Sequence, residues 1–127
     1  MPLPINDPYI EAIAQRVRTV VRQPGHDLDH VAQSLAVPAP ELRRLVEAPD
    51  RAIDSAFLID VLGALVRVFA LDPKWLLTGE YDPGAHRRAL ELTEANPQVA
   101  ERTVREWVRE QYRRVRAGLE PWSLRIQ

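Results

Sequence analysis

The sequence predicts an all-α protein, and three observations point to this class. First, pairs of a helix-capping residue followed by proline recur along the chain, at Asp7-Pro8, Asp72-Pro73, Asp82-Pro83 and Asn96-Pro97. Second, the apolar residues between these pairs follow the three-to-four-residue spacing of amphipathic helices. Third, no segment shows the alternating pattern of a half-buried strand, and the eleven prolines lie almost entirely at the expected helix boundaries.

Each Asp-Pro or Asn-Pro pair is a helix start signal, because the side-chain oxygen can cap the first free N–H groups. Proline then fits the first helical position, where its missing donor does no harm. The first helix is expected over residues 8–22 and ends at Gln23-Pro24-Gly25. The second, with Asp27 as its cap, is expected over residues 28–35, and the third over residues 40–47.

The fourth helix, predicted over residues 55–70, is apolar on nearly every side and is therefore expected to be buried. A short fifth helix over residues 73–77 stops at Gly79, a typical left-handed terminator. Two longer helices are expected over residues 83–95 and 97–117, with Gly118 ending the last.

Length and composition fit a small globular protein. The chain has 127 residues, of which 46% are hydrophobic and 28% are charged, which argues against wholesale disorder. It contains no cysteine, which excludes disulfides and thiolate metal sites and fits a reducing cytoplasm. The N-terminal region has no signal-peptide pattern, and the apolar stretch from Ala56 to Leu71 is too short for a bilayer span. We expect a cytoplasmic protein with no membrane association.

The segment LDHVAQSLAVPAPELRRLV, at residues 28–46, has the residue pattern of a helix-turn-helix. This motif requires a small residue where its two helices cross, a tight turn, and apolar residues that anchor the second helix. Ala32 is the small crossing residue and Ala36 stands at the turn. The matching apolar positions are Val31, Leu35, Val37, Leu42 and Leu45.

A second motif lies downstream, in ALVRVFALDPKWLLTGE at residues 64–80. Its acid-proline pair, aromatic-Leu-Leu step and glycine are Asp72, Pro73, Trp75, Leu76, Leu77 and Gly79. Together the two motifs resemble the Cro/repressor-type (XRE) helix-turn-helix family. The resemblance implies a five-helix, lambda-repressor-like domain over residues 8–80, followed by a two-helix C-terminal extension over residues 81–127. It also implies a DNA-binding transcriptional regulator.

The resemblance implies a set of contacts to double-stranded DNA. Arg43 and Arg44 would face the major groove, where each can read guanine or grip phosphate. The alternative is a solvated face on which these arginines pair with Glu41 or Glu47. The N-termini of the second and fourth helices would approach phosphate. The expected DNA-binding positions are Gln33, Ala39, Arg43, Arg44, Glu47, Arg51 and Ser55.

Several residues depart from the pattern of a DNA binder. The family often starts its second helix with Thr-Gln, whereas this chain has Asp27 and Leu28. The first recognition positions are Pro38, Ala39 and Pro40, which offer base edges only apolar contact.

The charge distribution also argues against strong DNA affinity. Within an overall net charge of −1, residues 1–23 carry +1, residues 24–82 carry −5 and residues 83–127 carry +3. Nonspecific affinity for DNA comes mainly from neutralised phosphates. A second hypothesis is therefore a protein-interaction module that keeps the fold and has lost sequence-specific DNA binding. A basic surface around the recognition arginines favours DNA, and an acidic one favours a protein partner.

The helix expected over residues 97–117 carries an apolar stripe and a basic stripe. Three readings of these stripes are open. In the first, the arginines pair with neighbouring glutamates. In the second, the apolar stripe docks on the fourth helix or on a second subunit, and in the third the basic stripe contacts DNA phosphate. We favour the second reading, with the first true of most of the arginines, and expect a homodimer. The predicted dimerisation residues are Val104, Trp107, Val108, Tyr112 and Val115.

No constellation of residues indicates an enzyme, a metal site or a cofactor. His26 and His30 are four residues apart, but His26 precedes the helix, so the two imidazoles would not share a face. No serine has a plausible base partner, and the five glycines form no phosphate loop. We therefore predict no catalytic residues, no metal ligands and no cofactor.

Overall fold

The computed structural model describes residues 8–47, 52–95 and 100–118, which form helices and no strand. The all-α prediction is therefore confirmed for this part of the chain. The chain divides into two compact units, residues 1–58 and 59–127, and the division falls inside the fourth helix. The predicted domain boundary near residue 80 stays a prediction.

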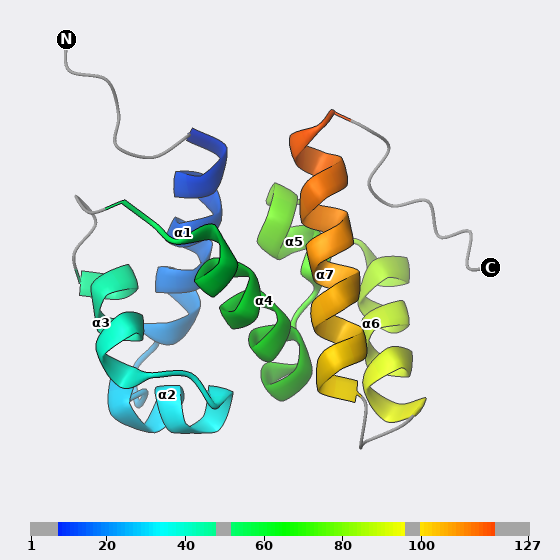
Figure 1. The fold of residues 1–127 in the computed structure, drawn as a ribbon. Helices are drawn as coiled ribbons and strands as arrows, with labels where there is room; N and C mark the ends of the chain where they lie inside the picture. Colours follow the sequence, from blue (N-terminus) through cyan, green and yellow to red (C-terminus); the bar gives the residue numbers. More distant parts are fainter. Residues whose placement is uncertain (1–7, 48–51, 96–99, 119–127) are drawn as a thin grey trace, which may run out of the picture. The chain divides into compact units, whose positions relative to one another are not determined.

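The described helices begin and end close to the predicted positions (Figure 1). They are α1 (Pro8–Val21), α2 (Leu28–Leu35), α3 (Ala39–Glu47), α4 (Ser55–Phe69), α5 (Pro73–Thr78), α6 (Pro83–Ala95) and α7 (Ala100–Arg116). The first six agree with the predicted bounds to within one residue. The predicted start of the last helix, at Asn96-Pro97, lies outside the described residues.

In the first unit, α3 packs against both α1 and α2, and α2 crosses near the C-terminal end of α1 (Figure 1). Apolar residues at helical spacing from all three helices meet in a common core. The buried apolar residues of this unit are Ile13, Ala14, Val17, Val20, Val21, Val31, Ala32, Leu35, Leu42, Leu45, Val46 and Leu58.

Two arginines, Arg18 in α1 and Arg22 directly after it, bind the C-terminal carbonyls of α3. Arg18 Nε donates to the Leu45 carbonyl at 2.8 Å, and Arg22 Nη2 donates to the Val46 carbonyl at 2.6 Å. The last carbonyls of a helix have no intrahelical partner, and cations are favoured at that end of the helix dipole. Because the partners are more than twenty residues apart, these bonds fix α3 on α1, an arrangement that the sequence pattern did not predict.

In the second unit, α6 and α7 run antiparallel side by side, and α5 contacts both (Figure 1). The remaining turns of α4 approach α7 closely at Gly63. A β-carbon at Gly63 would lie 3.2 Å from the Arg105 Cα, so only glycine allows this approach without a shift. Arg105 also pairs with Asp60 of α4 at 3.6 Å. The contact supports the reading in which the last helix docks on the fourth.

Among the described residues, aspartates cap four helices. The predicted caps Asp27, Asp72 and Asp82 accept N–H groups at the starts of α2, α5 and α6. Asp54, which was not predicted as a cap, accepts the Ala56 and Phe57 N–H groups at the start of α4. Within the described residues, no helix combines the length and apolar character needed to cross a membrane.

Candidate nucleic-acid interface

The α2–α3 pair has a tight left-handed turn at Ala36, where φ is 57° and ψ is 42°. The Ala36 N–H donates to the carbonyls of Ala32 and Gln33, and the Val37 N–H donates back to Ala32 at 3.0 Å. This bonding pattern closes the end of α2 and redirects the chain into α3. The position expected to form the turn of a helix-turn-helix therefore does form a tight turn between two short helices.

Ala36→Gly is expected to raise the free energy of unfolding by about 0.5–1 kcal/mol. Alanine in the left-handed region is strained by about 1–2 kcal/mol, and glycine removes this strain. Glycine also has more conformational freedom in the unfolded chain, which offsets about 0.4–1 kcal/mol of the gain. Urea unfolding followed by circular dichroism measures the change. The matched control is Ala12→Gly inside α1, which should destabilise by about 1 kcal/mol. A loss of stability in Ala36→Gly would contradict the assigned backbone conformation.

Arg43, the first predicted base-reading residue, is held between two acidic side chains. Its Nη2 donates to Asp29 Oδ1 of α2 at 2.7 Å, and its Nη1 lies 3.6 Å from Glu47 Oε1. The hydrogen bond from Arg43 to Asp29, and then the charge of Asp29, raise the pKa of the Arg43 guanidinium. The expected alternative pairing with Glu47 is therefore present, and Asp29 is a stronger partner that was not predicted.

The other predicted DNA-binding positions are spread over three helices. Gln33 on α2 and Arg44 on α3 are exposed, and the side chain of neither makes a hydrogen bond or ion pair within the described residues. Ala39 and Ser55 are half-buried first residues of α3 and α4. Glu47, the last residue of α3, is exposed and meets Arg43. Arg51 lies outside the described residues.

The surface formed by residues 26–47 is acidic. This segment carries four acidic residues, Asp27, Asp29, Glu41 and Glu47, and two arginines, for a net charge of −2. Both arginines lie on α3, and one of them is engaged by two of the acids. Of the seven predicted positions, the structure brings Arg43 and Glu47 into direct contact.

Most of the predicted dimerisation stripe is buried within the chain. Val104, Val108 and Tyr112 are buried, whereas Trp107 and Val115 are half-buried. A second subunit could reach the first three only if α7 moved away from its neighbours. The homodimer remains a prediction, and the two half-buried residues are the part of the stripe that keeps exposed surface.

The basic stripe of α7 consists of Arg102, Arg105, Arg109, Arg113 and Arg116, and part of it pairs with acids on the same helix. Arg102 lies 3.4 Å from Glu106, and Arg113 donates to Glu110 at 2.7 Å. The Glu110 pKa is lowered, first by its hydrogen bond with Arg113. For Arg102 and Arg113, these pairs agree with the expectation of a solvated, charge-paired face.

The described residues contain no group of three or more His, Cys, Asp or Glu side chains placed to hold a metal ion. Comparison of the chain with protein-family models, with curated proteins and with solved structures gives no significant match.

Proposed function

We propose that this protein is a DNA-binding transcriptional regulator that uses α2, the Ala36 turn and α3 as a helix-turn-helix. The observation that carries the proposal is the left-handed turn at Ala36 between two short helices, α2 and α3. Buried Leu42 and Leu45 anchor α3 on the core, while Arg44 on the same helix is exposed. A recognition helix requires both features, an apolar face packed on its own domain and polar side chains exposed to DNA.

The acids around Arg43 weaken the interaction with DNA but do not prevent it. The Arg43, Asp29 and Glu47 side chains are 42%, 63% and 53% exposed, so their ion pairs lie in water. Exposed ion pairs contribute only about 0–1 kcal/mol, and a phosphate or a guanine edge can replace them at little cost. The negative charge of the acids remains, however, and it lowers affinity for every DNA sequence. Specific binding then depends on Arg43 and Arg44.

The test is fluorescence anisotropy with duplex DNA from upstream of the gene, measured over a salt series beside a scrambled duplex. We expect tighter binding to the upstream duplex. Arg43→Ala/Arg44→Ala should lose about tenfold or more in affinity and lower the salt slope by about two. Asp29→Asn, which removes a negative charge beside Arg43, should tighten binding.

The matched control is Arg87→Ala/Arg88→Ala, which removes the same charge from the surface of α6. This variant should bind the upstream duplex as the parent protein does. Equal losses in the two double variants would show that total charge, not α3, governs binding. No binding to either duplex at low salt would exclude the regulator.

A homodimer is part of the proposal, because helix-turn-helix proteins commonly read two half-sites with two subunits. The half-buried residues Trp107 and Val115 are the predicted contact that remains on the surface. Sedimentation equilibrium should give twice the chain mass at micromolar protein concentration. Trp107→Ala should weaken that association, and a single-chain mass at every concentration would exclude the dimer.

A protein-interaction module is the second candidate, and the net charge of −2 over residues 26–47 favours it. In this function Asp29 and Glu47 are part of the recognised surface and Arg43 organises them. Two results together would support the protein-interaction module. The parent protein would fail to bind DNA but would bind a protein partner, and Asp29→Asn/Glu47→Gln would lose that partner.

A further inference from the structure

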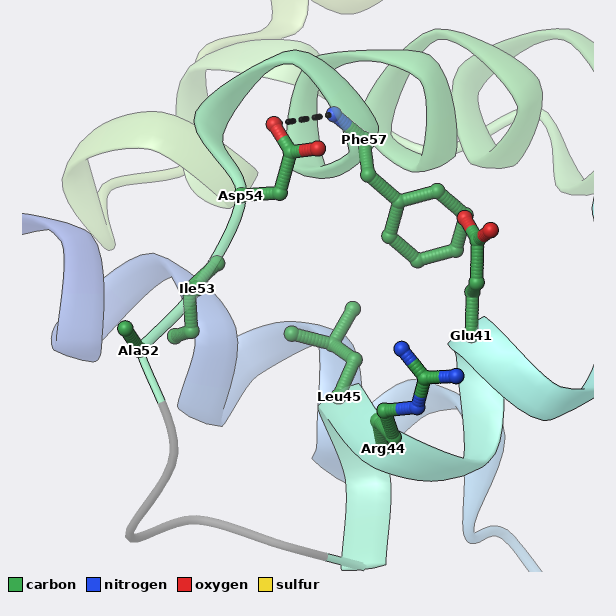
Figure 2. Close-up of a pocket in the computed structure, with 7 residues that line it drawn as sticks. All are labelled: Glu41, Arg44, Leu45, Ala52, Ile53, Asp54 and Phe57. Carbon is green, nitrogen blue, oxygen red and sulfur yellow. Dashed lines mark hydrogen bonds between the residues drawn. The ribbon is translucent and has the colours of Figure 1, made fainter.

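The first unit contains a small pocket between α3 and the start of α4 (Figure 2). Its volume is about 260 Å³, and it is lined by Glu41, Arg44, Leu45, Ala52, Ile53, Asp54 and Phe57. Ligand pockets for drug-sized molecules begin at about 300 Å³. The pocket therefore suits a smaller molecule.

The pocket combines an apolar wall with a charged rim. Leu45 is buried, and Ile53 and Phe57 are half-buried, so these side chains offer apolar contact inside the pocket. Figure 2 shows Ala52 and Ile53 on one side, with the Glu41 carboxylate and the Arg44 guanidinium on the opposite side. An occupant that fits must carry an apolar group and meet charges of both signs.

The two rim charges on α3 are available to a ligand. Glu41 and Arg44 stand one turn apart and are exposed, and their side chains make no hydrogen bond or ion pair within the described residues. Asp54 differs, because its Oδ1 already accepts the N–H groups of Ala56 and Phe57 at the start of α4. That carboxylate therefore closes the helix terminus to an incoming anion and leaves Arg44 as the cation that a ligand carboxylate can reach.

We propose that this pocket binds a free α-amino acid with an apolar side chain, of about the size of leucine or phenylalanine. The ligand carboxylate would bind Arg44, its ammonium group would bind Glu41, and its side chain would contact Leu45, Ile53 and Phe57. A simple carboxylic acid would leave Glu41 unpaired beside the ligand's negative charge. A simple amine would leave Arg44 unpaired in the same way. The zwitterion satisfies both charges.

The same contact would regulate the proposed DNA binding, and this step rests on the proposed function. Arg44 is one of the two arginines proposed to contact DNA, and it cannot serve a ligand carboxylate and a DNA phosphate at once. Occupation of the pocket would therefore weaken DNA binding, and DNA would weaken amino-acid binding by the same factor.

Isothermal titration calorimetry of the full chain without DNA tests the site, with leucine, phenylalanine, glycine, isocaproate and isoamylamine as probes. We expect leucine or phenylalanine to bind with a millimolar or tighter dissociation constant. Isocaproate and isoamylamine, which each lack one charged group of leucine, should bind about tenfold more weakly. Arg44→Gln and Glu41→Gln should each weaken binding by a similar factor, whereas Arg87→Gln on α6 should not.

Three results would overturn the site: leucine and phenylalanine binding no more tightly than glycine, isocaproate binding as well as leucine, or Arg44→Gln and Arg87→Gln behaving alike. Circular dichroism establishes that each variant is folded, which is expected because Glu41 and Arg44 are exposed. The calorimetry contains no DNA, so it tests the ligand site separately from the proposed regulator. If the protein binds leucine or phenylalanine but no DNA duplex, the regulator is overturned and the ligand site stands. DNA binding that leucine does not weaken would overturn the regulatory step alone.

Discussion

Arg18→Ala is expected to lower the free energy of unfolding by about 3 kcal/mol. The Arg18 side chain is 4% exposed; its Nε donates to the Leu45 carbonyl at 2.8 Å and its Nη1 to Glu11 Oε1 at 2.7 Å. Alanine would leave a cavity in the core of the first unit and remove the bond that fixes the end of α3. Chemical denaturation with urea, followed by circular dichroism, measures the loss.

Two further variants separate the contributions of packing and charge at Arg18. Arg18→Met keeps most of the side-chain volume and removes the hydrogen bonds, so it should cost about 1–2 kcal/mol. Glu11→Gln keeps an oxygen acceptor for Arg18 and removes the negative charge, and it should cost about 1 kcal/mol or less because Glu11 is one-third exposed. A change below about 0.5 kcal/mol in Arg18→Ala would contradict the buried role of this arginine.

Helix positions were predictable because their signals are local. Pro73 and Pro83 stand at the first positions of α5 and α6, and the preceding aspartates cap those helices through bonds to residues two or three positions ahead. Such signals need no knowledge of the tertiary arrangement. The turn at Ala36 follows the same logic, because its bonds reach only three to five residues back.

The partners of Arg18 and Arg43 were not predictable in the same way. Arg18 reaches a backbone carbonyl 27 positions away, and Arg43 reaches Asp29, 14 positions away, only because α2 and α3 pack together. A carbonyl acceptor also has no residue-type signature. The pairing of Arg43 with Glu47, four residues along the same helix, is the part that spacing alone indicated.

The apolar stripe of α7 shows a different limit of sequence patterns. Val104, Val108 and Tyr112 have the spacing of a buried helix face, and this spacing is the same whether the cover comes from a second subunit or from the same chain. A usable signal was present in α4, where Gly63 interrupts an apolar helix. A glycine in such a position indicates a close approach of another backbone, and Arg105 of α7 is the residue that approaches.

The candidate ligand pocket depends on residues that sequence reasoning placed in other roles. Phe57 belongs to an apolar helix that was expected to be buried on nearly every side, yet it is half-buried and lines the pocket. Glu41 was considered as a possible partner of the α3 arginines and instead stands unpaired within the described residues. Both outcomes depend on how α3 meets the start of α4, which no local pattern encodes.

Asp72→Ala is the second substitution with a large expected effect, a loss of about 3 kcal/mol. Asp72 is 5% exposed, and its two carboxylate oxygens accept separate N–H groups. Oδ1 accepts the Lys74 N–H at 3.0 Å and caps α5, while Oδ2 accepts the Asp82 N–H at 2.6 Å, just before α6. One buried carboxylate therefore joins the starts of two helices in the second unit.

Asp72→Asn separates the capping bond from the bond to Asp82. Asparagine caps helices about as well as aspartate, but its amide nitrogen would face one of the two N–H donors. We therefore expect Asp72→Asn to cost about 1–2 kcal/mol. The control is Asp54→Asn, because Asp54 accepts the Ala56 and Phe57 N–H groups through Oδ1 alone, and this change should alter stability by less than about 0.5 kcal/mol.

Amide hydrogen exchange locates the effect at single residues. In Asp72→Asn the Asp82 N–H should lose protection while the Lys74 N–H keeps it, because the remaining oxygen can still cap α5. Equal stability of Asp72→Asn and the parent protein, with an unchanged Asp82 amide, would contradict the second bond. Loss of protection at Asp82 would instead show that this carboxylate connects α5 to α6, a role beyond the helix cap that the Asp-Pro pair predicts.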